Sequence, residues 1–304
     1  MKKPSLSVAI PAFNEGKNIE VILTSLIKQK RKSFTLKSIL VHSDASTDNT
    51  CEQVKKLSKK YPEITLKAGK KRQGKYSRMN QIFHDCRTDF LVVLDADIKL
   101  VGRHFLDTLV HSLQSDPKAL MVAAHQVLLQ PSTFIGKVIH ANFVLWDLIR
   151  WSIPNYDSAN NFYGSATAFR GSFARTVHIP SYLSDPHLFI YLSADKYRGF
   201  RYCRQAEILQ WPISTLKDYR KLLNRSLGKR DILLEKIFNV DTEQVYHVPL
   251  KYKVKGVIQA LRWQPMYIVL AMMLNFYMQK LRHFTRIDKN AVWDIVTSTK
   301  KTMV

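Results

Sequence analysis

Two aspartates, Asp95 and Asp97, follow the apolar run Phe90–Leu94 with a single alanine between them. In extended backbone, side chains two positions apart point to the same side, so both carboxylates can face one cation. Carboxylate oxygens suit Mg²⁺ or Mn²⁺ ions that bridge to phosphates. The alternatives are a solvated turn or a helix cap at Asp97. The motif therefore predicts a divalent metal site if other polar residues gather beside it.

Polar residues of the same kind follow two other apolar runs. Asn14 and Glu15 come after the first run, and Asp44 comes after the second, where its carboxylate can accept hydrogen bonds from a nucleotide base. The neighbouring residues 46–49 are good helix N-caps, which explains them without a ligand. Lys75 opens a predicted helix, a position that suits a phosphate contact.

Short apolar runs alternate with helical periodicity over the first hundred residues. The predicted strands are Leu6–Ile10, Ser38–His42, Ile64–Ala68 and Phe90–Leu94. The predicted helices between them are Asn18–Lys30, Asn49–Tyr61 and Lys75–Cys86. This alternation is typical of βαβ units, so we expect an α/β fold with a parallel sheet and helices on both faces. Ligands of such sheets lie at the carboxyl ends of the strands, which is where the polar residues gather.

The chain of 304 residues has a globular composition, with 46% hydrophobic and 23% charged residues. Its 47 lysines and arginines outnumber 24 aspartates and glutamates, which gives a net charge of +23. Such a charge predicts an anionic partner: nucleic acid, an acidic membrane surface or a phosphorylated substrate. The three cysteines, Cys51, Cys86 and Cys203, have neither zinc spacing nor a disulfide pattern, which favours a reducing compartment.

The C-terminal part of the chain combines basic residues with an apolar segment. Trp263–Gln279 contains no charged residue. As a helix this segment would reach only about 25 Å, which is short of a hydrocarbon core of about 30 Å. From Lys217 onward there are 17 basic residues and 7 acidic ones. These features favour a helix in the interface of an anionic membrane over the alternative, a buried helix of a soluble subdomain.

Two common nucleotide-binding signatures do not occur in the sequence. No Gly-x-Gly-x-x-Gly follows the first predicted strand, and no Walker-type loop that ends in Gly-Lys-Ser or Gly-Lys-Thr occurs. A nicotinamide-dependent oxidoreductase and a P-loop hydrolase are therefore disfavoured.

Four motifs occur in the order that characterises one enzyme family. They are Ser7–Glu15, Ser43–Asp48, Gly74–Asn80 and Asp95–Asp97. Together they resemble the signature of family 2 glycosyltransferases over roughly the first three-quarters of the chain. The resemblance implies an A-type glycosyltransferase fold with a mixed, mostly parallel sheet. It also implies a divalent metal (Mg²⁺ or Mn²⁺), a nucleotide-diphospho-sugar donor and inversion at the anomeric carbon.

The resemblance implies roles for residues of the nucleotide-sugar-binding half, residues 1–100. Pro11, Ala12 and Glu15 would line the nucleotide pocket. Asp44 would contact the base. These positions are carried over because each one falls inside a matching motif.

The diphosphate and the metal would lie beside the paired aspartates. By the same resemblance, Asp95 would contact the ribose, the diphosphate and the metal, and Asp97 would be the principal metal ligand. Lys75 and Arg225 are candidates for stabilising charge on the phosphates. Arg225 belongs to a degenerate Gln-x-x-Arg-Trp motif that has Ser226 in place of tryptophan. This loss argues against a polymer-extruding synthase.

The acceptor half would occupy residues 101–230. Gly164 and Ser165 begin a segment that is similar to the acceptor-side segment of the family. Asp185 falls where the family places its catalytic carboxylate, although the usual acidic neighbour is a serine here. Asp195 is the alternative base.

We therefore predict an inverting, metal-dependent glycosyltransferase with a catalytic domain over residues 1–230. A basic, helical, membrane-associating tail, residues 231–304, would hold it peripherally or shallowly inserted at the cytoplasmic face of the cell membrane. Asp185 would take the proton of a hydroxyl on a lipid-linked or cell-envelope glycan acceptor. One alternative is a nucleotidyltransferase, although the glycine-rich basic loop that such enzymes show after the first strand does not occur. The other is a nucleic-acid-binding protein, which the acidic strand ends disfavour.

Overall fold

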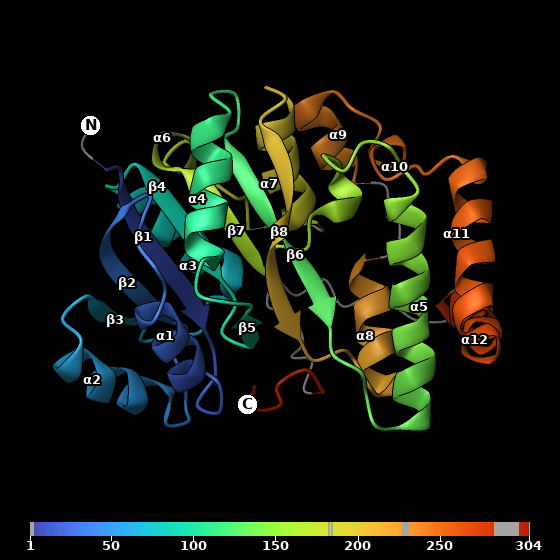
Figure 1. The fold of residues 1–304 in the computed structure, drawn as a ribbon, viewed down its shortest axis with the longest axis horizontal. Helices are drawn as coiled ribbons and strands as arrows, with labels where there is room; N and C mark the ends of the chain where they lie inside the picture. The colour runs from blue at the N-terminus through green and yellow to red at the C-terminus, as the bar shows by residue number, and fades with distance from the viewer. Residues whose placement is uncertain (1–2, 182, 184, 227–230, 283–297, 304) are drawn as a thin grey trace. The chain divides into compact units, whose positions relative to one another are not determined.

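The computed structural model describes residues 3–181, 183, 185–226, 231–282 and 298–303. The chain forms two compact units (Figure 1). Unit 1 comprises Met1–Val127, Phe162–Gln210 and Lys300–Val304, and unit 2 comprises Leu128–Asn161 and Trp211–Thr299. This division does not follow the boundary predicted at residue 230. Residues 128–161 group with the C-terminal helices, and the last five residues group with the sheet.

The first half of unit 1 alternates strands and helices. Its strands are β1 (Ser5–Ala12), β2 (Thr35–Ser43), β3 (Ile64–Ala68) and β4 (Phe90–Leu94). Its helices are α1 (Ile19–Ile27), α2 (Thr50–Lys60) and α3 (Lys75–Asp85). The strands lie in the order β3-β2-β1-β4, and each neighbouring pair is parallel. The carboxyl ends of these four strands therefore lie at one edge of the sheet.

The sheet changes direction where β4 meets β7. The further strands are β5 (Ile98–Leu100), β6 (Met121–Leu128), β7 (Ala166–Arg170) and β8 (Phe200–Gln210). They extend the order to β3-β2-β1-β4-β7-β6-β8-β5, and the pairs β4–β7, β6–β7 and β5–β8 are antiparallel. The expected mixed sheet is confirmed, whereas the mostly parallel arrangement holds only for β1 to β4.

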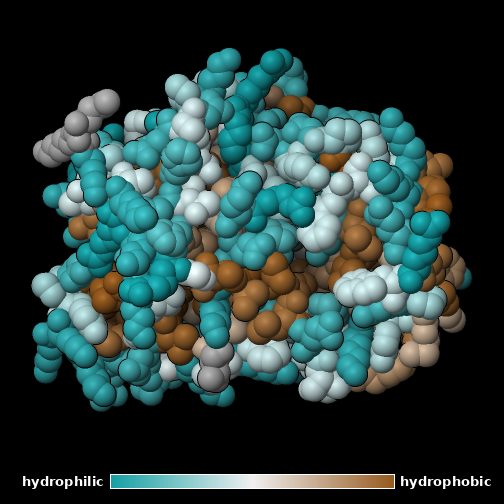
Figure 2. Space-filling view, viewed as in Figure 1, coloured by the Kyte–Doolittle hydropathy of each residue, from teal (hydrophilic) through white to brown (hydrophobic). Residues whose placement is uncertain are grey.

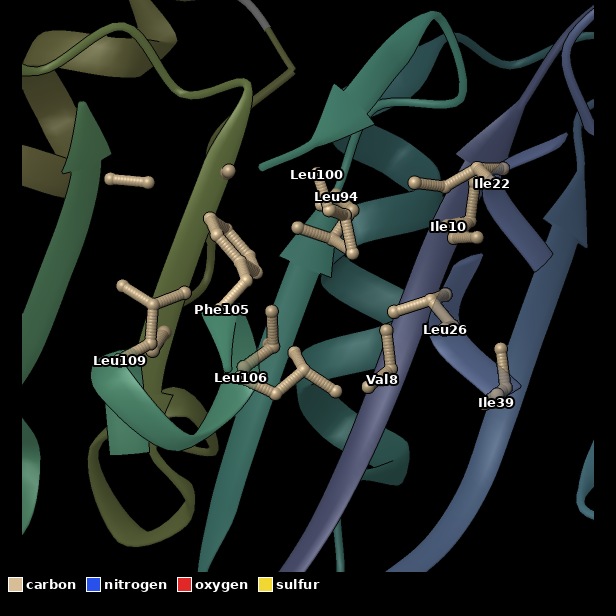
Figure 3. Close-up of a cluster of buried hydrophobic side chains, with 14 of the residues drawn as sticks. Val8, Ile10, Ile22, Leu26, Ile39, Leu94, Leu100, Phe105, Leu106 and Leu109 are labelled. Carbon is tan, nitrogen blue, oxygen red and sulfur yellow. The ribbon is translucent and has the colours of Figure 1, made fainter. Parts of the chain in front are cut away.

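Helices cover both faces of this sheet. Apolar residues at helical spacing form the buried face of α1: Ile19, Ile22, Leu23 and Leu26. Together with α4 (Phe105–Ser115) this face packs on side chains such as Leu94 of β4 (Figure 3). On the opposite face, Phe83 of α3 packs edge-on against Phe169 of β7, with ring centroids 5.1 Å apart. The remaining helices of unit 1 are α6 (Gly171–Ala174) and α7 (Pro186–Asp195).

The described part of unit 2 is helical. Its elements are α5 (Phe134–Trp151), the 3₁₀ helix η1 (Ala159–Asn161), α8 (Leu216–Ser226), α9 (Ile232–Phe238), α10 (Thr242–Val245), α11 (Leu250–Trp263) and α12 (Pro265–Arg282). Helices α5, α11 and α12 share an apolar core that includes Leu145, Ala260 and Ala271. Gly256 lets α11 approach α5 closely, because a Cβ atom there would lie 2.5 Å from Cγ1 of Ile149.

A buried polar network links three helices of unit 2. The Asn142 amide donates to the Tyr219 hydroxyl at 3.1 Å, and that hydroxyl donates to the side-chain oxygen of Asn275. The Asn275 amide completes the ring by donating to Oδ1 of Asn142 at 2.5 Å. Burial raises the pKa of Tyr219 to about 12. Asn275, a polar residue in an apolar segment, is therefore turned into the protein, where its groups are bonded.

The apolar segment Trp263–Gln279 falls on the end of α11 and on α12. One face of α12 is buried at Ile268, Ala271 and Met278, whereas Met266, Val269, Met273 and Phe276 are exposed. Among the described helices, none combines the length and the hydropathy that crossing a membrane requires.

Candidate active site

Hydrogen bonds tie the loop after β1 to the loop after β2. The bonds join Asn14 N to Ser46 Oγ (3.1 Å), Thr47 N to Asn14 Oδ1 (2.8 Å), Glu15 N to Thr50 Oγ1 (2.8 Å) and Gly16 N to Asp48 Oδ2 (2.9 Å). Asn14 and Ala45 have φ angles of 53° and 58°. This left-handed conformation costs a residue with a side chain about 1–2 kcal/mol, and such strain clusters at functional sites. Residues 46–48, which were predicted as helix caps, thus form hydrogen bonds that hold the loop after β1.

Asp44 is bonded on both carboxylate oxygens. Oδ1 accepts from the backbone N–H of Gln73 at 2.8 Å and from Nε of Arg78 at 2.7 Å, and Oδ2 accepts from Gly74 N at 2.8 Å. The Asp44 and Arg78 side chains are each only 5% exposed. Gly74 has a φ of 90°, which favours glycine at this position. Asp44 thereby fixes the start of α3, and its contact with a nucleotide base stays a prediction.

Lys75 reaches the paired aspartates from the first turn of α3. Its Nζ lies 2.5 Å from Oδ1 of Asp95 and 3.5 Å from the carbonyl oxygen of Gly164. The backbone N–H of Asp95 donates to the carbonyl oxygen of Ser165 at 2.8 Å. The structure therefore brings together a residue predicted for the phosphates, one predicted for the metal and two predicted for the acceptor side.

Asp97 is far less well paired than Asp44. The donors recorded on its carboxylate are the Gln210 amide, 3.4 Å from Oδ1, and its own backbone N–H. Burial and the negative charge of Asp95 raise the pKa of Asp97 from 3.8 to about 6, against the opposing charges of Lys300 and Lys75. Because its ionised form is disfavoured, a cation that entered beside Asp97 would be stabilised there.

Glu15 is a buried carboxylate that the C-terminal segment reaches. Nζ of Lys300 lies 2.5 Å from its Oε1. Burial raises the pKa of Glu15 from 4.5 to about 7, the charge of Lys300 opposes this rise, and Asp97 and Asp95 add to it. Lys300 is not predictable from the sequence alone, because nothing local signals a contact between residues 285 positions apart.

Asp95, Asp97 and Glu15 interact electrostatically at this edge of the sheet. Among the described residues, no three His, Cys, Asp or Glu side chains form a group that could hold a metal ion by itself. Mg²⁺ is usually held by one or two carboxylates, with substrate phosphates and water as its other ligands, and Mn²⁺ prefers the same kind of oxygen ligand. The poorly paired Asp97, with Asp95 two residues before it, fits a site of that kind.

The predicted acceptor-side residues lie against the start of α7. Gly164 has a φ of 70°, and a Cβ atom there would lie 2.5 Å from Nε2 of His187. Asp185 caps α7, since its Oδ1 accepts from Leu188 N at 2.9 Å. Asp195 is the last residue of the same helix. The structure thus places Asp185, rather than Asp195, at the helix end beside Gly164, and its catalytic role stays a prediction.

The other predicted residues lie in different places. Pro11 and Ala12 end β1, where they pair with His42 and Ser43 of β2, and their role in the nucleotide pocket stays a prediction. Arg225 belongs to α8 of unit 2. Its side chain lies outside the described residues.

The fold is similar to those of solved glycosyltransferases. Mannosyltransferase PcManGT from Pyrobaculum calidifontis, in complex with GDP-Man and Mn²⁺, superposes with a TM-score of 0.55 at 18% identity, over 95% of this chain and 78% of that one. S. aureus TarS residues 1–349, in complex with UDP-GlcNAc, gives a TM-score of 0.51 at 16% identity, over 86% and 80% of the two chains. These similarities show an A-type glycosyltransferase fold, as predicted.

The sequence identifies the family. Residues 7–179 match the model of glycosyl transferase family 2, and the chain therefore belongs to this family. A relative, poly-β-1,6-N-acetyl-D-glucosamine synthase of Staphylococcus aureus, is 26% identical over 180 residues, which are 56% of this chain and 42% of that protein. The chain thus spans less than half the length of this relative. The predicted family is confirmed, and with it the prediction that the protein is a glycosyltransferase.

Proposed function

We propose that this chain moves a sugar from a nucleotide-diphospho-sugar to a hydroxyl of a lipid-linked or cell-envelope glycan, with inversion and with a divalent metal. The observation that carries the proposal is Asp97, a carboxylate for which no ion pair occurs among the described residues, at the strand edge where such sheets bind nucleotides. The GDP-Man and Mn²⁺ bound to the Pyrobaculum enzyme support this donor class and metal. The bacterial polysaccharide synthase supports a glycan acceptor.

The donor half of the mechanism follows from the strand-end residues. Asp97 and Asp95 would hold Mg²⁺ or Mn²⁺, which when bound neutralises charge on the departing nucleoside diphosphate. Lys75 would add a positive charge to the same phosphates, because its ammonium group already lies beside Asp95. The buried pair of Asp44 and Arg78 would keep the first turn of α3, and so Lys75, in position.

The acceptor half needs a base, because a sugar hydroxyl is a poor nucleophile at neutral pH. Asp185 would accept the hydroxyl proton as the oxygen attacks the anomeric carbon and the bond to the diphosphate oxygen breaks. General-base assistance of this kind contributes about 10²–10⁴-fold to the rate. Attack opposite the leaving group inverts the anomeric carbon, so no covalent intermediate on the protein is required.

A screen of nucleotide sugars tests the donor. The purified chain is heated with each candidate in the presence of Mn²⁺, and the true donor raises the unfolding midpoint because it binds the folded state. Transfer and hydrolysis are then measured with that donor. An Asp97→Ala variant that hydrolysed nucleotide sugars with metal as fast as the parent would overturn the proposed mechanism.

Two aspartates on one helix give a matched test of the base. Asp185→Asn should lower the transfer rate by about 10²–10⁴-fold while donor affinity stays at the parental value. Asp195→Asn, at the other end of α7, serves as the control and should keep the parental rate. The reverse result would assign the base to Asp195, and the anomeric configuration of the product, read by NMR, tests inversion directly.

We further propose that unit 2 holds the enzyme on the cytoplasmic face of an anionic membrane. Helices α11 and α12 expose large apolar side chains: Val254, Ile258, Trp263, Met266, Val269, Met273 and Phe276. Figure 2 shows hydrophobic surface along the edge where Figure 1 places these helices. Exposed cations lie on the same two helices: Lys251, Lys255, Arg262 and Lys280. Apolar residues among cations suit the interface of an acidic bilayer.

Vesicle binding tests this placement. We expect the full chain to co-sediment with vesicles of phosphatidylcholine and phosphatidylglycerol, less so at high salt, and only weakly with phosphatidylcholine alone. The double variant Met273→Ser and Phe276→Ser removes two side chains that are 63% and 62% exposed, and it should bind less. Tyr197→Ser removes a side chain that is 61% exposed on unit 1 and serves as the control. Equal binding by all three proteins would overturn the proposal.

A further inference from the structure

The C-terminal segment Lys300–Met303 contacts the loop that follows β1. Nζ of Lys300 lies 2.7 Å from the carbonyl oxygen of Phe13, 3.4 Å from that of Asn14 and 2.5 Å from Oε1 of Glu15. All of these residues belong to unit 1. One side chain from the C-terminal segment therefore binds three consecutive residues at the exit of β1.

The same segment is fixed at a second point, where the loop enters α1. Met303 is only 1% exposed, and its backbone N–H donates to Oδ1 of Asn18 at 3.1 Å. Asn18 is itself buried and directly precedes α1. The segment thus contacts the loop of residues 13–18 near both of its ends. The ammonium group of Lys300 binds the first part of the loop, and the backbone N–H of Met303 binds Asn18 at its end.

The ammonium group of Lys300 has two close acceptors and a third, weaker one. A lysine ammonium has three N–H donors, and the recorded acceptors of Lys300 are also three, two carbonyl oxygens and one carboxylate oxygen. Lys300 is thus placed to hold the loop of residues 13–18 rather than to bind a phosphate. Lys75, by contrast, contacts Asp95 of the paired aspartates.

The loop has a reason to need such support. Asn14 has a φ of 53°, a left-handed value that asparagine tolerates better than most residues and that the contacts of the loop help to hold. Glu15 is buried close to two other carboxylates, Asp97 and Asp95. Removal of Lys300 would leave the Glu15 carboxylate buried without its cation and two carbonyl groups without this donor, which favours another loop conformation.

We propose that Lys300–Met303 is a clamp that fixes the loop of residues 13–18 in the shape that receives the donor nucleotide, with Lys300 as a positioning residue. The inference rests on the proposed function, which assigns Glu15 and the end of β1 to the nucleotide pocket. It adds a part of the chain that lies outside the region matched by the family model, residues 7–179.

Nucleotide affinity tests the clamp in the full chain. Uridine diphosphate and guanosine diphosphate, each with Mn²⁺, are titrated calorimetrically, and the tighter ligand is kept. Lys300→Ala should weaken its binding by about 10-fold, the loss that 1.4 kcal/mol produces. Lys300→Arg keeps the charge but presents its donors in a planar fork, so it should restore only part of the affinity. Lys56→Ala removes the same charge from an exposed position of α2, outside this loop, and should bind as the parent does.

Two further measurements separate positioning from general stability. Amide hydrogen exchange over residues 13–18 should become faster in Lys300→Ala and stay at the parental rate in Lys56→Ala. With the true donor, Lys300→Ala should raise KM more than it lowers kcat, because the loop is assigned to donor binding. Met303→Ala keeps Lys300 but removes the buried side chain, and it should also weaken nucleotide binding.

The outcomes distinguish the clamp from the function on which it rests. A parent protein that binds neither nucleoside diphosphates nor any nucleotide sugar overturns the proposed function. If the parent binds a nucleotide, and Lys300→Ala binds it with equal affinity and shows unchanged hydrogen exchange over residues 13–18, the clamp alone is overturned. Tighter binding by Lys300→Ala would show that the segment blocks the site, which also overturns the clamp.

Discussion

Asp44 and Asp97 follow two parallel strands of the same sheet, and the hydrogen bonding of their carboxylates differs sharply. Asp44, one residue beyond β2, is buried and accepts three hydrogen bonds of 2.7 to 2.8 Å from two backbone N–H groups and Arg78. Asp97, beyond β4, has the 3.4 Å contact from Gln210 and its own N–H, and it lies near the like charge of Asp95. The same residue type is thus satisfied at one strand end and left poorly paired at the other.

The difference separates a carboxylate that builds the fold from one that awaits a ligand. A buried charge with good partners is costly to remove, because its partners would then be left unpaired. A poorly paired carboxylate is costly to keep, unless a cation joins it. Substitutions at the two positions should therefore affect stability and activity in different proportions.

The largest expected effect is the loss of stability in Asp44→Ala. The change leaves the Arg78 guanidinium and the N–H groups of Gln73 and Gly74 buried without this acceptor. Breaking a buried pair in this way costs about 3–5 kcal/mol of unfolding free energy. The measurement is chemical unfolding of both proteins.

An exposed ion pair of the same chemistry is the control for Asp44. Asp85→Ala removes the carboxylate that Lys67 contacts at 2.8 Å, where the two side chains are 44% and 50% exposed. Pairs of this kind contribute about 0–1 kcal/mol, so the midpoint should hardly move. Equal losses in the two variants would remove the distinction drawn for Asp44.

Asp97→Asn should show the opposite balance. Donor hydrolysis with metal should fall by about 10²–10³-fold, the range found when one group that stabilises transition-state charge is removed. The unfolding midpoint should stay at or above the parental value, because the substitution removes a charge that burial disfavours. A variant that lost activity and stability together would indicate that Asp97 supports the fold as Asp44 does.

The local elements were predictable because their signals are local. Strands β3 and β4 begin and end where the predicted strands do, and α3 begins at Lys75 as predicted. The face that α12 buries was not predictable, because both of its faces are apolar and periodicity gives no contrast. The antiparallel half of the sheet and the grouping of α5 with the C-terminal helices depend on packing between distant segments.

The candidate site was predictable in its position and only partly in its chemistry. Polar residues at the carboxyl ends of strands indicated where Glu15, Asp95 and Asp97 would gather. The pairing of Asp44 with Arg78 was missed, because a single sequence does not show which distant cation a carboxylate will meet. Lys300 was missed for the same reason, at a far larger separation.

The response to Mn²⁺ sharpens the same contrast. A metal that binds only the folded state at 100 times its dissociation constant stabilises it by about 2.7 kcal/mol. We expect Mn²⁺ to raise the unfolding midpoint of the parent and of Asp85→Ala, and to leave that of Asp97→Asn unchanged. Thermal unfolding with and without Mn²⁺ measures this. A rise in Asp97→Asn equal to that of the parent would place the metal elsewhere.

The last expected effect is the pH dependence of stability. The pKa of Asp97 is about 6 in the folded protein and near 3.8 as an ordinary carboxyl group. Between these pH values the folded state keeps a proton that the unfolded chain has lost, so raising the pH through this window lowers the free energy of unfolding. Asparagine does not titrate. The parent should therefore lose stability relative to Asp97→Asn, by about 3 kcal/mol over the whole window, as the pH rises from about 4 to about 7.

Asp85 gives the opposite sign and serves as the control. The hydrogen bond from Lys67 lowers the pKa of Asp85, so its contribution is present above the ordinary pKa and is lost as the pH falls. The parent should thus gain stability relative to Asp85→Asn as the pH rises toward about 3.8, below the range in which it loses stability relative to Asp97→Asn. Chemical unfolding of the three proteins at several pH values measures both differences. If the stability difference between the parent and Asp97→Asn does not change with pH, the Asp97 carboxylate is already paired in the metal-free protein. The contrast with Asp44 would then fail.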